Sequence, residues 1–157
     1  PISLGLIFIL LFWAFLSVKN ALLIVMNVPF ALIGGILILL ATGIHLSISA
    51  AVGFIALFGV AVQNGVILVS HLNQLRRNGQ NLHDALVNGS VSRLRPVVMT
   101  ASMAILGLLP AALSTGVGSE TAKPFAVVII GGLLTSTFLT LTLLPALYRY
   151  FAEPDEP

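Results

Sequence analysis

The chain has 157 residues, of which 58% are hydrophobic and only 8% are charged, and its formal net charge is +2. A soluble domain has about a quarter of its residues charged, so this composition excludes a water-soluble globular protein and indicates one that lies in lipid. The small net charge gives no reason to expect a nucleic-acid partner, and the absence of cysteine excludes disulfides, thiolate metal sites and thiol redox chemistry.

Several apolar segments approach or exceed the length of about 20 residues that a helix needs to cross a membrane. We therefore predict an all-α membrane protein, a polytopic bundle of five transmembrane helices. The predicted helices cover residues 2–18, 21–42, 47–74, 96–113 and 124–150. The first follows Pro1 without the basic leader of a signal peptide, so we expect the chain to be a fragment of a larger protein.

The connection between the third and fourth predicted helices is polar and basic. Residues 81–91 place Leu and Ala near one face, which predicts a short amphipathic helix at the cytoplasmic membrane surface, with Asn81 as its N-cap. Pro96 then suits the first turn of the fourth span, where its missing N–H costs nothing. Ser47 or Ser49 is the expected cap of the third span, and residues 152–157 form a polar C-terminal tail.

Small residues recur inside the predicted membrane helices. Pairs that are adjacent or four residues apart allow two helices to approach closely, which is how membrane helices commonly pack. The candidate helix-packing residues are Gly34, Gly35, Ala61, Gly65, Gly131 and Gly132.

Basic residues predict the orientation of the bundle. If successive helices alternate in direction, one side of the membrane receives Lys19, Arg76, Arg77, Arg93, Arg95 and Arg149. The opposite side receives only Lys123, next to Glu120. Because short cytoplasmic loops carry an excess of Lys and Arg, we expect the first side to be cytoplasmic.

Four polar residues are candidates for a proton-relay or transport pathway. Gln63 begins a stripe that Ser70 and Gln74 continue on one helical face, and Asn64 lies beside it. These two amides are either interhelical hydrogen-bonding groups or part of a pathway. Arg93 and Thr100 share a face of the fourth span, where Arg93 is either an interfacial anchor or a partner for an acid on another helix.

Other chemistry has little support in the sequence. None of the five predicted spans contains Asp or Glu, so any proton-carrying acids must lie upstream of residue 1. Met99 and Met103 lie one turn apart, but such a pair is usually core packing, and the three His residues fall on two sides of the membrane. We therefore predict no metal site, no cofactor, no catalytic residue and no enzyme activity.

Five sequence blocks, in their order and spacing, resemble the inner-membrane permeases of resistance-nodulation-division (RND) efflux systems. The blocks are VPFALIGG, SISAAVGFIALFGVAVQNGVILV, RLRPVVMTA, GLLPAALSTGVGSE and PFAVVIIGGLLTSTFLTLTLLPALYRYF. The resemblance covers residues 1–151 and implies the last five of twelve membrane helices in a multi-pass protein of the bacterial inner membrane. It also implies a homotrimer that works with its own upstream half, a periplasmic adaptor protein and an outer-membrane channel, and that is driven by protons.

The resemblance also gives the polar residues expected roles. The eleventh-helix Arg and Thr of the family's drug-exporting branch fall on Arg93 and Thr100, and the relay Lys of that branch falls on Gln63, followed by the matching Asn64. Because Gln63 cannot carry a charge, and because SISAAVGFIALFGVAV looks most like the heavy-metal branch, the expected function is proton-driven export of metal cations. The alternatives are a multidrug permease and a non-transporting, lipid-sensing membrane module of the same fold.

Overall fold

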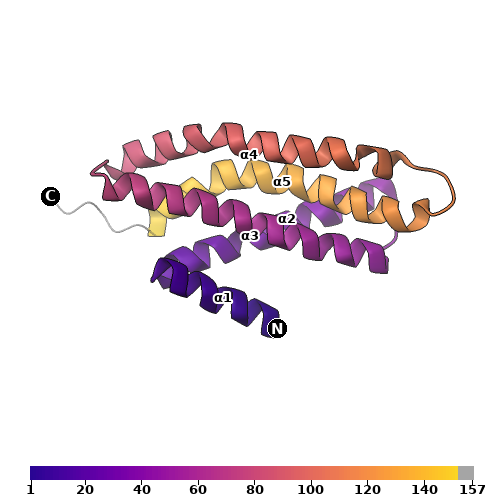
Figure 1. Ribbon diagram of the computed structural model, residues 1–157, viewed down its shortest axis with the longest axis horizontal. Helices are drawn as coiled ribbons and strands as arrows, with labels where there is room; N and C mark the ends of the chain where they lie inside the picture. The colour runs from indigo at the N-terminus through magenta and orange to yellow at the C-terminus, as the bar shows by residue number, and fades with distance from the viewer. Residues whose placement is uncertain (152–157) are drawn as a thin grey trace.

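The computed structural model describes residues 1–151, which form a bundle of antiparallel α-helices (Figure 1). The helices are α1 (Ile2–Phe15), α2 (Val18–Thr42), α3 (Ile48–Arg77), α4 (Leu82–Leu113) and α5 (Ser119–Phe151). Of these, α2, α3, α4 and α5 are each long and apolar enough to cross a membrane. The predicted all-α class is confirmed, with four long candidate spans and one shorter apolar helix, α1, in the described range.

Helix α5 lies at the centre of the bundle and packs against α2, α3 and α4. Helix α1 packs mainly against α2 and leaves the bundle at an angle, so that its N-terminal end stands apart (Figure 1). Its only buried residue is Leu11, which joins the core near the turn into α2.

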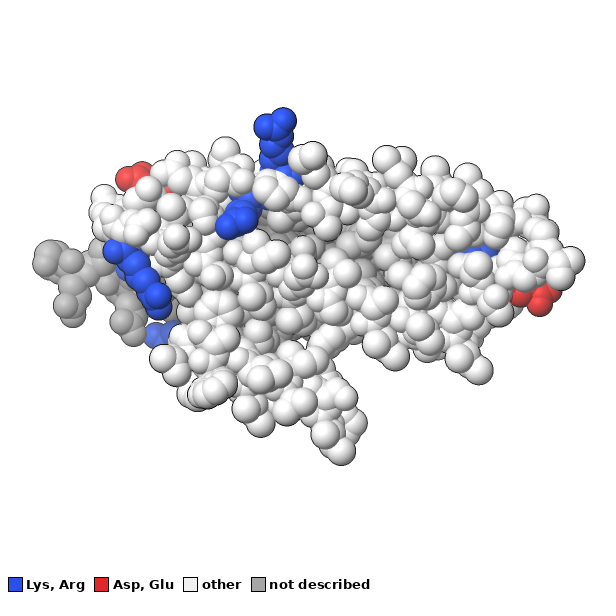
Figure 2. All heavy atoms as spheres, viewed as in Figure 1, with Lys and Arg blue, Asp and Glu red and all other residues white. Residues whose placement is uncertain are grey.

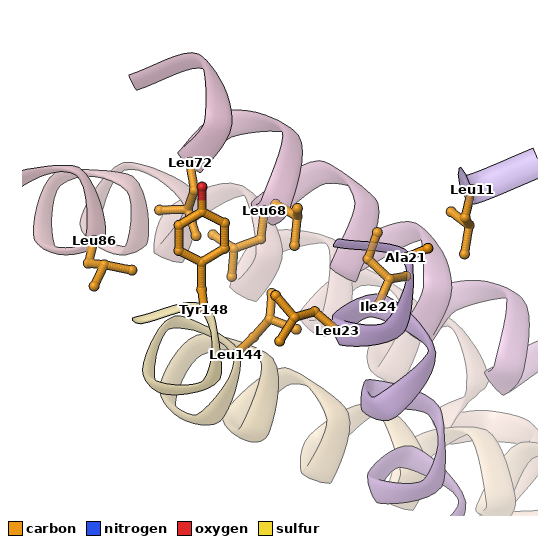
Figure 3. Packing of buried hydrophobic residues seen from close by; sticks show 10 residues of the cluster. Leu11, Ala21, Leu23, Ile24, Leu68, Leu72, Leu86, Leu144 and Tyr148 are labelled. Carbon is orange, nitrogen blue, oxygen red and sulfur yellow. The ribbon is translucent and has the colours of Figure 1, made fainter. Parts of the chain in front are cut away.

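One core cluster fills the end of the bundle where α1 meets α2 and where α3 meets α4. It contains Leu11, Ala21, Leu23, Ile24, Leu68, Val69, Leu72, Leu86, Leu144 and Tyr148. Figure 3 shows the Tyr148 ring of α5 beside Leu68 and Leu72 of α3, while Leu144 meets Leu23 of α2. Because lipid is as apolar as these side chains, the cluster stabilises the bundle by close packing and not by exclusion of water.

Glycines let the central helices approach closely. A Cβ placed on Gly34 of α2 would collide with Thr135 and lie 2.9 Å from the Gly131 carbonyl oxygen of α5. A Cβ on Gly131 would in turn collide with Ile38 and lie 3.0 Å from the Gly34 carbonyl oxygen. The two backbones therefore cross in direct contact, and any side chain at either glycine would force them apart.

The other packing candidates are buried as well. Ala61 is fully buried. A Cβ added to Gly65 would lie 3.2 Å from the Ile24 side chain of α2. An added Cβ on Gly35 would lie 2.6 Å from Phe54, and one on Gly132 would collide with Leu57. All of these contacts join α2 or α5 to a neighbouring helix.

Two helix starts follow the expected capping chemistry. The Ser47 hydroxyl accepts a hydrogen bond from the Ala50 amide at 3.2 Å, so of the two serines proposed as the cap of α3 it is Ser47 that fills this role. The Ser17 hydroxyl accepts from the Asn20 amide at 3.5 Å at the start of α2. Asn81 is the N-cap residue of α4, but its side chain makes no capping hydrogen bond.

The structure differs from the predicted boundaries of all five helices; α2 begins three residues earlier, at Val18, and α3 ends three residues later, at Arg77. The first helix ends at Phe15, and α5 begins at Ser119, before Pro124. Residues 81–91, predicted as a separate surface helix, are the first turns of α4, which runs without a break through Pro96. Proline removes one backbone hydrogen bond but need not end a long helix whose neighbours support it. The predicted tail, residues 152–157, lies outside the described residues.

Charged residues gather near one end of the bundle. Figure 2 shows most of the Lys and Arg side chains on the visible face in the half that contains the α3–α4 turn, and few at the far end. Helix α4 has 32 residues. At 1.5 Å per residue it is about 48 Å long, so it exceeds a hydrocarbon layer of about 30 Å. Its charged first turns, which carry Asp84, Arg93 and Arg95, are the part that would project from the layer.

Candidate transport-pathway residues and buried polar contacts

The two adjacent amides of α3 lie in different surroundings. Asn64 is buried at 7% exposure, whereas Gln63 is exposed on the outside of the bundle together with Ser70 and Gln74. Consecutive residues of a helix point about 100° apart, so one of the two can enter the core while the other faces outward. The polar stripe therefore lies on an outer surface of the described helices.

Arg93 and Thr100 also lie at or near the surface of the bundle. The exposed Thr100 hydroxyl donates to the Pro96 carbonyl oxygen at 2.9 Å, within its own helix. Arg93 is half-buried, and its Nε is buried without a hydrogen-bond partner among the described residues. Within residues 1–151 no hydrogen bond joins any two of Gln63, Asn64, Arg93 and Thr100.

A polar contact between α3 and α4 lies next to Arg93. The Ser92 hydroxyl donates to the Gly89 carbonyl oxygen at 3.1 Å, so the His71 Nε2, at 2.8 Å, is the donor to Ser92. The other imidazole nitrogen, Nδ1, is buried and unpartnered among the described residues. Arg93 is close enough to His71 for its positive charge to act on the imidazole.

The most buried polar network joins three helices at the centre of the bundle. The Asn27 Nδ2 of α2 donates to the Ala61 carbonyl oxygen of α3 at 3.2 Å and to the Thr140 hydroxyl of α5 at 2.9 Å. Thr140 Oγ1 also lies 3.2 Å from Asn27 Oδ1, to which it can donate. Thr140 is fully buried and Asn27 is 4% exposed, so this network satisfies polar groups that lipid cannot.

Sequence reasoning missed the roles of Asn27 and Thr140. The available signal was an Asn in an apolar span, because an amide in mid-membrane must find partners. A second missed contact lies nearer the charged end, where the Tyr148 hydroxyl donates to Asn73 Oδ1 at 2.6 Å. It joins α5 to α3.

No metal cluster is present within the part of the chain that the structure describes. No group of three or more His, Cys, Asp or Glu side chains is arranged to hold a metal ion there. Met99 and Met103 of α4 are 57% and 72% exposed and point away from the core of this bundle. The polar groups described above are hydrogen-bonding side chains and cations.

The chain is similar to known proteins over nearly its whole length. Residues 1–152 match the family described as AcrB/AcrD/AcrF. The chain is 52% identical over 156 residues to the cobalt-zinc-cadmium resistance protein CzcA of Cupriavidus metallidurans, an alignment that covers 99% of this chain. It is 43% identical over 160 residues to the cation efflux system protein CusA of Escherichia coli K12, with 95% of this chain covered.

The fold agrees with a solved structure. A crystal structure of a heavy metal efflux pump, in its crystal form II, superposes with a TM-score of 0.88 at 49% identity and covers 96% of this chain. The chain spans 15% of the length of that structure and of the two relatives named above.

Proposed function

This chain belongs to the AcrB/AcrD/AcrF family of resistance-nodulation-division proteins, and we propose that the whole protein exports heavy-metal cations from a bacterium. The observation that carries the proposal is the 52% identity to a cobalt-zinc-cadmium resistance protein over 99% of the chain. The protein is then a transporter of the bacterial inner membrane, with the charged end of the bundle in the cytoplasm.

Helices α1 to α5 supply the polar and basic groups of a proton pathway, and other helices of the permease supply its acids. Helices α1 to α4 contain one acidic residue, Asp84, near the α3–α4 turn, and α5 contains one, Glu120, in its first turn. Intramembrane carboxylates carry protons in most pumps, so the acids belong to the upstream half of the permease. The exposed amide of Gln63 supports this arrangement, since a polar group facing lipid would be costly and a facing helix would satisfy it.

Arg93 is the residue we assign to contact those acids. Its Nε is buried and lacks a partner among residues 1–151, and a guanidinium is well suited to a carboxylate. Thr100 lies two turns further along α4 and is exposed on the outside of the bundle. Proton binding to the missing acids would then change the pairing of Arg93 and the packing of α4.

Gln63 favours metal over drug export. The drug-exporting branch places a Lys at this position, and an uncharged amide cannot take part in a Lys–carboxylate switch. The partners follow from the same proposal: a second and third copy of the permease, a periplasmic adaptor protein and an outer-membrane channel.

Expression of the full-length protein in a bacterium that lacks its own metal and drug exporters tests the proposal. We expect higher tolerance of Co²⁺, Zn²⁺, Cd²⁺ or Cu⁺, unchanged tolerance of cationic dyes, and loss of metal efflux when the proton gradient is collapsed. Tolerance of dyes alone would support the multidrug alternative instead. A protein that changes neither tolerance would leave the lipid-sensing alternative.

A further inference from the structure

A polar cavity of about 270 Å³ lies at the charged end of the bundle, between α2, α3 and α5. It is lined by Ser17, Lys19, Asn20, Leu23, Asn73, Arg76, Tyr148 and Phe151. We propose that this cavity binds the phosphate headgroup of an anionic phospholipid. The proposal requires only that the bundle spans a membrane, so it does not depend on which cargo the protein exports.

Positive potential converges on the cavity from two sources. Lys19 and Arg76 bring cations from α2 and α3, and none of the described residues that line the cavity is acidic. The cavity also lies at the start of α2: Ser17 is the N-cap of this helix, which begins at Val18, and Lys19 and Asn20 lie in its first turn. The dipole of a helix start attracts anions, and here it adds to two side-chain charges, although the Asn20 N–H of this start is already bonded to the Ser17 hydroxyl.

The neutral groups of the cavity also present donors. Tyr148 is only 5% exposed, and its hydroxyl donates to Asn73 Oδ1 at 2.6 Å. This bond occupies the oxygen of the Asn73 amide, so the NH₂ group is the part of the side chain that remains to donate. A phosphate group, which has several acceptor oxygens and no donor when ionised, matches such a set.

The position of the cavity indicates a lipid and not a dissolved anion. Arg149 and Tyr150 are exposed beside it, and Tyr and basic residues are typical of the headgroup layer of a membrane. Leu23 and Phe151 give the cavity apolar walls. A second cavity of about 360 Å³ shares Asn73 and adds Arg77 and the aromatic ring of Phe15, which extends the polar and apolar surface available to one lipid molecule.

Binding of dioleoylphosphatidylglycerol to the purified full-length protein, followed by native mass spectrometry, tests the proposal. Dioleoylphosphatidylcholine, which has no net charge, is the comparison lipid. We expect the double variant Lys19→Gln/Arg76→Gln to bind phosphatidylglycerol roughly 10- to 30-fold more weakly than the unmodified protein, from the energy of two basic residues at a membrane surface. Phosphatidylcholine binding should stay the same.

The matched control is Arg149→Gln. Arg149 is an exposed cation at the same end of the bundle, on the same helix as Tyr148, and does not line the cavity. We expect this variant to bind phosphatidylglycerol as the unmodified protein does. If the double variant does not fold, Lys19→Gln alone serves, because Lys19 is exposed; we expect it to weaken binding roughly fivefold.

Three results would overturn the proposal. Equal weakening by Arg149→Gln would mean a general surface attraction, and unchanged binding in the cavity variants would mean that the lipid binds elsewhere. Displacement of phosphatidylglycerol by millimolar inorganic phosphate, together with stabilisation by phosphate alone, would assign the cavity to a dissolved anion. If the unmodified full-length protein binds phosphatidylglycerol in the cavity but exports no metal, the proposed function is contradicted and the lipid site is retained.

Discussion

Replacement of Thr140 by Val tests the buried network directly, because Val has nearly the shape of Thr and lacks its hydroxyl. In the structure this change removes the contact between Thr140 Oγ1 and the Asn27 amide, at 2.9 and 3.2 Å, and leaves the Asn27 bond to the Ala61 carbonyl oxygen. Interhelical hydrogen bonds in membrane proteins contribute about 0.6 kcal/mol on average and up to about 1.7 kcal/mol. Because Thr140 is fully buried, we expect Thr140→Val to lower the free energy of unfolding by about 1–2 kcal/mol.

Thr142 offers a matched control on the same helix. Its side chain is exposed, and its hydroxyl donates only to the Phe138 carbonyl oxygen of α5, at 2.8 Å. We expect Thr142→Val to change stability by less than about 0.5 kcal/mol, as surface substitutions usually do. The assay is unfolding of the full-length protein in mixed micelles with increasing dodecyl sulfate, monitored by circular dichroism.

A double-mutant cycle isolates the bond itself. Asn27→Leu removes the amide from α2, and its combination with Thr140→Val should cost less than the two single changes added together, by about 0.6–1.7 kcal/mol. Equal effects of Thr140→Val and Thr142→Val, or additive effects of the pair at positions 27 and 140, would refute the reasoning that this bond joins α2 to α5.

Three other predictions concern packing and transport. Gly131→Ala should destabilise the bundle by about 1–3 kcal/mol, whereas Gly107→Ala, which meets nothing within 4 Å, should be neutral or stabilising; equal effects in thermal unfolding would contradict this. Arg93→Gln should abolish metal tolerance in growing cells while the exposed neighbour variant Arg95→Gln retains it, and retention by both would remove Arg93 from the relay. Thr100→Ala should slow metal efflux from cells by about 10-fold or more at unchanged protein abundance, and unchanged efflux would withdraw its assignment.

The sequence was sufficient for the class of the fold because apolar length is a strong signal. Segments with so few charges leave the membrane helix as the only plausible structure, since lipid offers no partner to a free backbone group. Helix boundaries were harder to predict. Pro96 is as compatible with a helix start as with a tolerated interior position, and only the packing of Gly89 against Leu72 of α3 shows that α4 begins before it.

The polar contacts could be predicted only in part. The sequence singled out Gln63 and Asn64 because they are adjacent amides in an apolar helix, but periodicity cannot tell which of the two enters the core. Asn27 and Thr140 are 113 residues apart, so no local pattern connects them. Such a pairing depends on which helices become neighbours, and that is a property of the whole bundle.

The direct crossing of Gly34 and Gly131 has a mechanical consequence. Two backbones that touch, with bulky side chains locked on either side of the contact, cannot slide or rotate past one another without a collision. We therefore expect helices α2 and α5 to move together as one rigid body. A conformational change is then expected where the helices are less tightly packed. These places are α1, which packs mainly on α2, and the outward face of α4.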